Sequence, residues 1–319
     1  MRAIKFAVIS LLLAAAVLAA GPAAAESFKV AMVMPGNISD KSWNQAGYEG
    51  LMRVKNELGI EVAYSEKVAQ PDQAEALADY ARRGYNVVIG HGGEFQEAAF
   101  HVARKYPDTL FVINNGTRTA KNVAAVSIDL PQVGYLMGYI AGKMTKSGKV
   151  GYICAQKLKQ YVDLGLSYEK GFKAARPDGT AFTAWTNDWD DIAKGKEAAL
   201  NQINQGADVI FPTMDNATIG SLQAVKEKGV YAIGMYYDAI SDWPDIILNS
   251  AIVDWTQAMV ELFAPVKQGK TLEGRKYLFD LNYPKVLNIG TYLPSVPEDV
   301  RTEVAGLLEK VKSGQIKPY

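Results

Sequence analysis

Residues 76–89 read ALADYARRGYNVVI, an amphipathic helix that stops at Gly84 and is followed three residues later by the apolar run 87–89. Residues 199–211, ALNQINQGADVIF, repeat this pattern around Gly206. A helix that ends at glycine and leads into a short apolar run is typical of the helix-to-strand connection in a parallel sheet. The recurrence favours two similar α/β units, although any two α/β units would show the same local pattern.

The alternation of strands and helices extends from residue 28 to residue 235. The expected strands, which are short apolar runs, are 28–34, 60–64, 86–90, 109–114, 123–128, 149–154, 182–186, 208–212 and 231–235. The expected helices, whose apolar residues recur at helical spacing, are 41–58, 71–83, 94–105, 162–175, 192–205 and 217–228. This order predicts an α/β fold in which helices cover both faces of parallel sheets. The residues from 26 onward fit two sheets of about five or six strands better than one sheet of about twelve.

We therefore expect two doubly wound parallel-sheet lobes joined by a hinge. No linker rich in Pro, Gly or Ser separates them, so the chain is expected to cross between lobes more than once, near Asp129, Ser250 and Pro284. The boundaries that follow are 26–129 and 251–284 for lobe 1, and 130–250 and 285–319 for lobe 2.

Residues 1–25 are expected to be an export signal and no part of the fold. Arg2 and Lys5 precede the apolar stretch 6–19, and the small residues Ala23–Ala25 form a cleavage site before Glu26. The apolar stretch is short for a membrane span, which disfavours the alternative of an uncleaved anchor helix. No cysteine lies near the cleavage point, so no lipid anchor is expected. The mature protein is predicted to be soluble, periplasmic and monomeric.

The composition excludes several kinds of chemistry. The 34 Lys and Arg residues balance 34 Asp and Glu residues, which disfavours a basic surface for nucleic acid. A single cysteine, Cys154, excludes an internal disulfide framework and a cysteine-based zinc cluster. Two histidines, His91 and His101, leave little for a metal site or a catalytic triad. Neither a dinucleotide fingerprint nor a phosphate-binding loop is found, so no cofactor is expected and an enzyme such as a nucleoside hydrolase or dehydrogenase is disfavoured.

Residues that follow the expected strands are the candidates for ligand contact, because doubly wound sheets bind ligands beyond the carboxyl ends of their strands. Aromatic rings and short polar side chains gather there, without a cluster of Lys or Arg. The candidates are Trp43, Asn44, Gly92, Trp189, Asp215 and Tyr236. Such a set suits a flat, neutral molecule with polar edges better than a phosphate or a dianion.

Each candidate also has a structural interpretation. Trp43 and Trp189 are residues that could simply pack at the starts of helices. Asp40, Asp190 and Asn216 are of a type that caps helix N-termini, and for Asp190 we favour that role. His91 is interpreted as a loop residue. Two carboxylates could also form an acid–base pair, but the separation on which such catalysis depends is a matter of tertiary structure.

Residues 39–45, SDKSWNQ, resemble the D-K-S/G-F-N-Q segment of the basic membrane protein family. The resemblance continues in family order through 89–95 (IGHGGEF), 105–108 (KYPD), 134–143, 148–153, 194–199 and 206–211. Members are substrate-binding proteins of ABC transporters, and the best-understood ones are purine nucleoside receptors. The resemblance implies the type I periplasmic binding protein fold, a ligand in the cleft between lobes, a permease and an ATPase as partners, and no catalysis.

The family's ligand contacts map onto particular residues of this chain. An aromatic ring from each lobe sandwiches the purine, and the matching positions are Trp43 and Trp189. Asn44 matches the amide that reads the edge of the base. Asp129 lies near the position of a carboxylate that accepts from purine N–H groups, and Asp215 is a further candidate for the exocyclic amine.

Two departures from the family pattern bear on the ligand. Tyr236, in the run Ile-Gly-Met-Tyr, replaces an acid that binds ribose hydroxyls, and Val253 stands where members commonly carry Lys. The loss of both sugar-binding groups favours a free purine nucleobase, adenine first, over a nucleoside. A purine nucleoside, a sugar or a signal read by a membrane receptor remain the alternatives. A transcription regulator is excluded by the export signal and by the missing DNA-binding headpiece.

Overall fold

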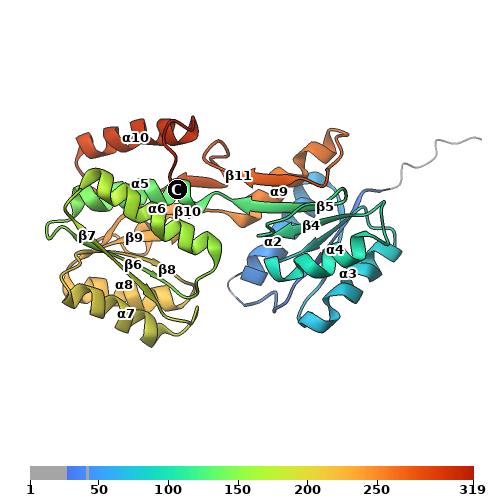
Figure 1. The fold of residues 1–319 in the computed structure, drawn as a ribbon, viewed down its shortest axis with the longest axis horizontal. Helices are drawn as coiled ribbons and strands as arrows, with labels where there is room; N and C mark the ends of the chain where they lie inside the picture. Colours follow the sequence, from blue (N-terminus) through green and yellow to red (C-terminus); the bar gives the residue numbers. More distant parts are fainter. Residues whose placement is uncertain (1–26, 41–42) are drawn as a thin grey trace, which may run out of the picture.

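The computed structural model describes residues 27–40 and 43–319, so the expected export signal lies outside the described residues. The chain forms two lobes, each built on its own six-stranded sheet (Figure 1). The strands of lobe 1 are β1 (Lys29–Val33), β2 (Glu61–Ser65), β3 (Val87–Gly90), β4 (Leu110–Asn114), β5 (Val123–Ile128) and β11 (Lys276–Phe279). The strands of lobe 2 are β6 (Lys149–Cys154), β7 (Thr180–Trp185), β8 (Val209–Thr213), β9 (Tyr231–Tyr236), β10 (Ile247–Val253) and β12 (Leu287–Ile289).

The two sheets have the same topology. Lobe 1 has the order β11-β5-β4-β3-β1-β2 and lobe 2 the order β12-β10-β9-β8-β6-β7. Every pairing in lobe 1 is parallel, and in lobe 2 only β10 and β12 are antiparallel. The prediction of two doubly wound α/β lobes is therefore confirmed, with the last strand of each sheet supplied by the C-terminal part of the chain.

Helices cover both faces of each sheet. Those of lobe 1 are α2 (Trp43–Leu58), α3 (Gln73–Arg82), α4 (Gln96–Ala103) and α9 (Trp255–Lys267). Those of lobe 2 are α5 (Leu130–Met144), α6 (Lys159–Ala175), α7 (Ile192–Asn204), α8 (Ala217–Lys228) and α10 (Glu298–Lys312). The described residues also include the short 3-10 helices η1 (Gln70–Asp72), η2 (Gly93–Phe95) and η3 (Ala239–Ser241).

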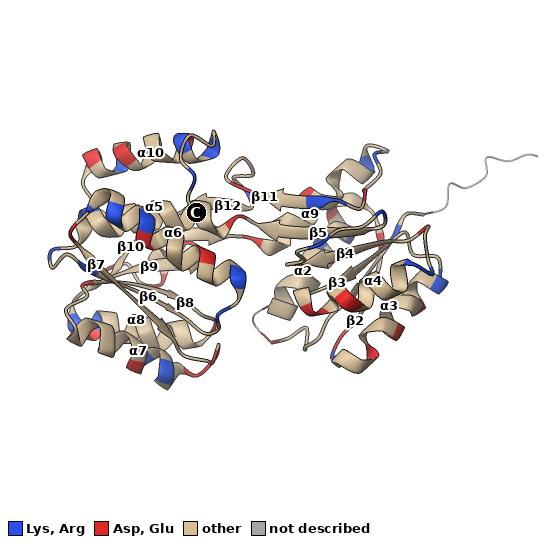
Figure 2. Ribbon diagram, in the orientation of Figure 1, with Lys and Arg blue, Asp and Glu red and all other residues tan. Residues whose placement is uncertain are grey.

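Strand β1 shows how a near-continuous apolar run serves two layers. Val30 and Met32 belong to the core that includes residues of α2 and α9, whereas Ala31 and Val33 belong to the core beneath α3 and α4. Alternate side chains of a strand point to opposite faces, so a strand covered on both faces must be apolar throughout. In Figure 2 the charged residues accordingly lie mostly on helices and loops.

The repeated motif occupies equivalent places in the two lobes. In lobe 1 helix α3 leads into β3, and in lobe 2 helix α7 leads into β8, which hold the same position in their sheets. Gly84 and Gly206 have φ angles of 76° and 98°, in the left-handed region that favours glycine. The likeness of the two segments thus reflects equivalent positions in two copies of one topology.

The chain crosses between lobes at three places. Asp129 joins β5 to α5, Asp254 joins β10 to α9, and residues 280–286 join β11 to β12. The crossings are tied together, because the Asp129 amide donates to the Phe279 carbonyl at 2.8 Å and the Asp254 amide donates to the Val286 carbonyl at 2.8 Å.

One boundary differs from the expectation. Ser250, the expected second crossing, lies inside β10, which pairs with β9 and β12 as far as Val253. Residues 251–253 therefore belong to the sheet of lobe 2, and the crossing falls at Asp254. The apolar run continues through these residues because they lie buried in that sheet, and the sequence contains no break that marks Ser250 as an end. Among the described residues, no helix is both long and apolar enough to span a membrane.

Candidate ligand-binding site

The strand ends that carry the candidate residues face one another. Helix α2, which follows β1, begins on the side of lobe 1 nearest lobe 2, and α6, which follows β6, begins on the side of lobe 2 nearest lobe 1 (Figure 1). Since neighbouring strands are parallel, the segments after the other inner strands lie on the same sides. We call these the interlobe side of each lobe.

Trp43 is the first residue of α2 and is held by two other aromatic residues. Its ring stacks on the ring of His91, with centroids 4.0 Å apart and planes inclined by 14°. The ring of Trp255, from α9, is nearly perpendicular to it, with centroids 5.1 Å apart and planes inclined by 88°. The Trp43 Nε1–H group donates to the His91 carbonyl at 3.3 Å. Its indole is therefore fixed by contacts from two separate segments of lobe 1, the loop after β3 and helix α9.

Asn44 has a structural role in the loop that precedes α2. Its Oδ1 accepts from the Gly36 amide at 3.0 Å, and its Nδ2 donates to Asp40 Oδ2 at 2.7 Å. Asp40 also accepts from the amides of Asn44 and Gln45, each at 3.0 Å, so its carboxylate caps the N-terminus of α2. Of the polar atoms of the Asn44 side chain, one lone pair and one hydrogen are left for any other partner.

Gly92 lies in the tight loop between β3 and η2. Its φ of 143° is one that non-glycine residues rarely adopt. A Cβ placed there would meet Glu94 Oε2 at 2.2 Å, and the residue is buried. Gly92 therefore shapes the turn that places His91 behind Trp43.

The candidate rings of lobe 2 form a second cluster around Tyr161. The Trp189 ring lies 5.2 Å from the Tyr161 ring at 56°, and the hydroxyls of Tyr161 and Tyr236 lie 2.9 Å apart. Tyr236 ends β9 with a φ of 74°, which is unusual for a bulky residue. Burial raises the pKa of both tyrosines, so they stay neutral. Asp215, on the loop after β8, contributes to the raised pKa of both and so lies near this pair.

The loops beside Trp189 show which acids cap helices. Asp191, rather than the expected Asp190, caps α7 by accepting from the Ala193 and Lys194 amides at 2.9 and 3.1 Å. Asp190 instead accepts from the Asn216 side chain at 2.8 Å, and Asn216 makes no side-chain cap bond to α8. Neighbouring aspartates are equivalent cap candidates in sequence, and the chain direction at the helix start selects between them.

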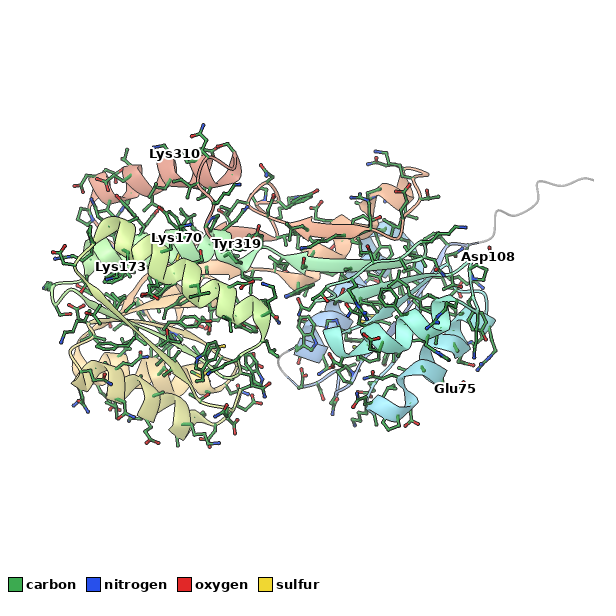
Figure 3. The ribbon with its side chains drawn as sticks, in the orientation of Figure 1. Glu75, Asp108, Lys170, Lys173, Lys310 and Tyr319 are labelled. Atoms are coloured by element: carbon green, nitrogen blue, oxygen red, sulfur yellow. The ribbon has the colours of Figure 1, made fainter. Side chains whose placement is uncertain are left out.

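Asp129, at the first crossing, is a buried carboxyl group that is only 7% exposed. Its Oδ1 has no hydrogen-bond partner among residues 27–40 and 43–319. Burial, with a smaller contribution from Asp280, raises its pKa from 3.8 to about 6, while Lys276 acts in the opposite direction. Tyr319, whose pKa Asp129 helps to raise, lies beside the crossing strands (Figure 3).

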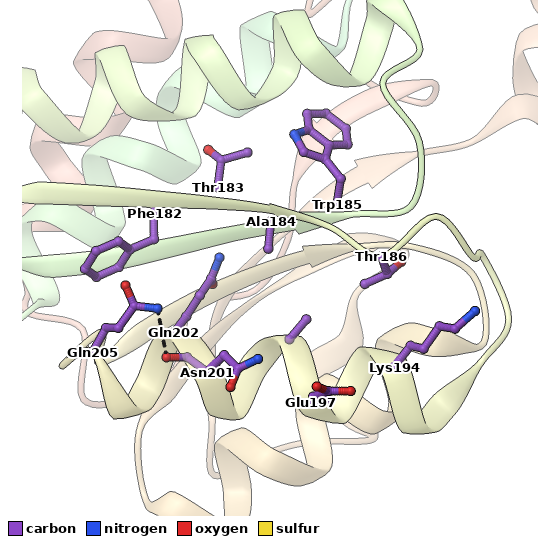
Figure 4. Close-up of a pocket in the computed structure, with 11 residues that line it drawn as sticks. Phe182, Thr183, Ala184, Trp185, Thr186, Lys194, Glu197, Asn201, Gln202 and Gln205 are labelled. Carbon is purple, nitrogen blue, oxygen red and sulfur yellow. Dashed lines mark hydrogen bonds between the residues drawn. The ribbon is translucent and has the colours of Figure 1, made fainter.

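Two surface grooves each lie within a single lobe. One, of about 460 Å³, runs between β7 and α7 in lobe 2, where Phe182 and Trp185 lie on the strand and Lys194 and Asn201 on the helix (Figure 4). The other, of about 360 Å³, is in lobe 1 and includes Tyr106. In the part of the chain that the structure describes, no group of three or more His, Cys, Asp or Glu side chains is placed to hold a metal ion.

Three residues of these clusters were missed in the sequence. His91 was interpreted as a loop residue, although it is fully buried against Trp43. Tyr161 fell just before the helix expected from residue 162, whereas α6 begins at Lys159. Trp255 lies beyond the last expected element. The one signal in the sequence is a histidine within a glycine-rich loop. Its partners could not be identified from the sequence, because they are remote in the chain.

This architecture, two α/β lobes joined by three crossings with polar and aromatic residues on their facing sides, is that of the two-lobed periplasmic binding protein fold. The sequence matches the family model described as ABC transporter substrate-binding protein PnrA-like, over residues 27–317. The chain belongs to this family, the one that carries the name Bmp, and the resemblance inferred from its motifs is confirmed.

Several relatives carry different functional names. A transcriptional activator protein of Bacillus subtilis is 33% identical over 290 residues, covering 90% of each chain. A purine-binding protein of Brucella abortus is 26% identical over 299 residues, covering 93% of this chain and 84% of that one. A Haloferax volcanii protein named for glucose binding in an ABC transporter is 26% identical over 297 residues, covering 93% of this chain and 75% of that one.

Solved structures support the fold. A transcriptional activator of the comK gene from Bacillus halodurans superposes with a TM-score of 0.78 at 25% identity, covering 91% of this chain and 100% of that chain. An ABC transporter solute-binding protein from Aeropyrum pernix superposes with a TM-score of 0.76 at 21% identity, covering 91% and 92%. Both are two-lobed matches over nearly the whole described chain.

Proposed function

We propose that this protein is the periplasmic substrate-binding protein of an ABC importer and binds a purine nucleobase, adenine first, between its lobes. The observation that carries the proposal is the pair of tryptophans, one on the interlobe side of each lobe and each backed by another ring. One face of Trp43 is covered by His91 at 4.0 Å, and Trp189 rests against Tyr161 at 5.2 Å. Stacking a base on one aromatic face contributes about 1–3 kcal/mol to binding.

The polar groups for the base edge are unequal in this proposal. Asp129 is the strongest acceptor, because its buried Oδ1 has no partner and would gain one from a purine N–H group. Asn44 contributes less than a free amide would, since Gly36 and Asp40 already occupy part of its hydrogen-bonding capacity. Asp215 lies near the Tyr161–Tyr236 pair and is assigned to the exocyclic amine. Gly92 acts through the loop that it shapes.

The preference for a base over a nucleoside rests on Tyr236. Its hydroxyl is held 2.9 Å from that of Tyr161, so the ring is fixed where family members carry an acid for ribose hydroxyls. Val253 is only 5% exposed and offers no polar group in place of the family's Lys. Ribose hydroxyls would lose water without gaining partners, at a cost of about 1–3 kcal/mol for each one stranded.

Titration calorimetry of the ligand-free mature protein with adenine and adenosine tests the proposal. Adenine should bind at least about tenfold tighter, which corresponds to about 1.4 kcal/mol. Equal affinities for adenine and adenosine would indicate that the protein binds purine nucleosides. If neither compound binds, the purine proposal fails altogether.

A sugar is the second candidate ligand, favoured by the Haloferax relative named for glucose binding. Sugars also stack on tryptophan, so Trp43 and Trp189 would serve either ligand. A glucose arm in the same calorimetry separates the two, because tight binding of glucose without binding of adenine would support the sugar.

The proposal assigns no catalytic step to the protein. Ligand binding is expected to close the lobes about the three crossings and to present the closed form to a permease and ATPase, without nucleic acid as a partner. A turnover assay with purines and nucleosides should therefore show no product.

The proposed location is the periplasm, with the mature chain starting at Glu26 as a monomer without a lipid anchor. N-terminal sequencing of exported protein should return Glu26. Recovery of Met1, or recovery from membranes alone, would contradict this part of the proposal.

A further inference from the structure

His91 directly follows β3, and both its ring and its backbone contact Trp43. Its ring is fully buried and lies 4.0 Å from the Trp43 ring at 14°, a stacked arrangement. The His91 backbone carbonyl accepts from Trp43 Nε1–H at 3.3 Å. The same residue therefore fixes both the plane of the indole and its polar edge.

The polar atoms of the His91 ring fix its tautomer. Nε2 lies 2.9 Å from the Trp43 carbonyl, and Nδ1 lies 2.8 Å from Asn114 Nδ2. The Asn114 Nδ2 group can only donate and the Trp43 carbonyl can only accept, so Nδ1 accepts and the ring proton is on Nε2, from which it donates to that carbonyl. Burial lowers the pKa of His91 to about 4, so this neutral form is the one present near neutral pH.

A glycine on α2 leaves the space for this ring. Gly47 lies one helical turn after Trp43, and a Cβ built there would be 2.5 Å from His91 Nε2 and 2.6 Å from His91 Cε1. Any larger residue at this position would displace the imidazole. Trp43, Gly47, His91 and Asn114 therefore form one packed unit drawn from α2, the loop after β3, and β4.

We propose that His91 is the positioning residue of the stacking platform: its neutral ring covers one face of Trp43, fixes the indole plane and leaves the opposite face for the purine. The inference rests on the proposed function for its ligand. His91 itself does not contact the purine, since the indole lies between them.

The size of the effect follows from pre-organisation. An indole already held in its bound orientation loses little freedom when the base arrives, whereas a freely rotating one must be immobilised first. Loss of the stacked imidazole should therefore weaken adenine binding by roughly three- to tenfold. We expect the fold to be retained, because the hydrophobic cores of lobe 1 are formed by other residues.

Two variants and one control test the proposal. His91→Gln retains an amide donor for the Trp43 carbonyl but removes the stacked ring. Gly47→Ala keeps His91 but forces its ring to move. Gly306→Ala is the matched control, because Gly306 also lies within a helix and a Cβ there would meet nothing within 4 Å. Calorimetry gives the affinity for adenine, and near-ultraviolet circular dichroism reports the tryptophan environment without ligand.

We expect both site variants to change the tryptophan dichroism and to weaken adenine by roughly three- to tenfold, with Gly306→Ala unchanged in both measurements. In a Trp43→Ala background, His91→Gln should have no further effect on affinity, because His91 acts through Trp43. A full additional loss in that background would overturn the proposal.

The ligand-free measurement separates this inference from the proposed function. If the wild-type protein binds no purine, the proposed function is wrong. The dichroism of the ligand-free variants still tests whether His91 positions Trp43. A wild-type dichroism spectrum in both His91→Gln and Gly47→Ala would overturn the positioning role even if adenine binds.

Discussion

Replacing Asp129 by Asn should stabilise the ligand-free protein and weaken its binding of adenine. Asp129 is only 7% exposed, and its Oδ1 has no hydrogen-bond partner. A buried carboxylate without a partner destabilises the folded state, because the charge has lost its water without gaining an equivalent interaction. Asn keeps the shape of the side chain and removes the charge.

The magnitude follows from the pKa of Asp129. Burial, assisted by Asp280, raises this pKa from 3.8 to about 6 in the folded protein. Each pH unit of that difference corresponds to about 1.4 kcal/mol, so the ionised group costs the folded state about 3 kcal/mol well above pH 6. The substitution should recover about 2–3 kcal/mol there, because a neutral amide at this site carries no charge to bury.

The raised pKa also fixes the direction in which stability changes with pH. Between pH 3.8 and about 6 the folded protein holds the Asp129 proton more tightly than the unfolded chain, so wild-type stability falls as the pH rises through this window. The advantage of Asp129→Asn should be full above pH 6 and should disappear near pH 3.8. Urea unfolding at several pH values measures it, with Asp191→Asn as the control, since Asn replaces Asp well at a helix N-cap.

A variant that is no more stable than wild type at pH 8, or a difference that does not change with pH, would refute this reasoning. The same variant should bind adenine more weakly if Asp129 accepts from a purine N–H group. A stabilised variant with undiminished affinity would leave the electrostatic account in place and remove Asp129 from the ligand site.

Three further results are expected. Trp189→Ala should weaken adenine binding by about 1–3 kcal/mol in calorimetry, the value of one stacking face, and an unchanged affinity would exclude Trp189 from the site. Tyr236→Asp, alone or with Val253→Lys, should shift the preference toward adenosine, and a further loss of adenosine binding would argue against a sugar subsite there. In the Asp129→Asn background the folded protein should lose stability as the pH falls from 6.5 to about 4. Burial lowers the pKa of His91, so protonation of this residue favours the unfolded chain. Adding His91→Gln should make this loss of stability smaller.

The stacking candidates were visible in the sequence, but their supports were not. Trp43 and Trp189 are candidates because they follow expected strands, beyond which doubly wound sheets bind ligands. The ring behind each of them comes from elsewhere in the chain: His91 stacks on Trp43, and Tyr161 rests against Trp189. Asn44 likewise looked free to read a base, whereas its amide is largely engaged within its own loop.

The sequence alone determined the α/β class, the two repeated units and the residues at the strand ends, because apolar periodicity and glycine stops are local properties of the chain. The place of the second crossing was decided by tertiary structure, since strand β10 continues to Val253 only because β9 and β12 flank it. The raised pKa of Asp129 also depends on the fold, because burial of a carboxyl group arises from segments that meet only after the chain has crossed between the lobes. Such long-range contacts leave no periodic signal in the sequence, and they decide how the candidate site is held.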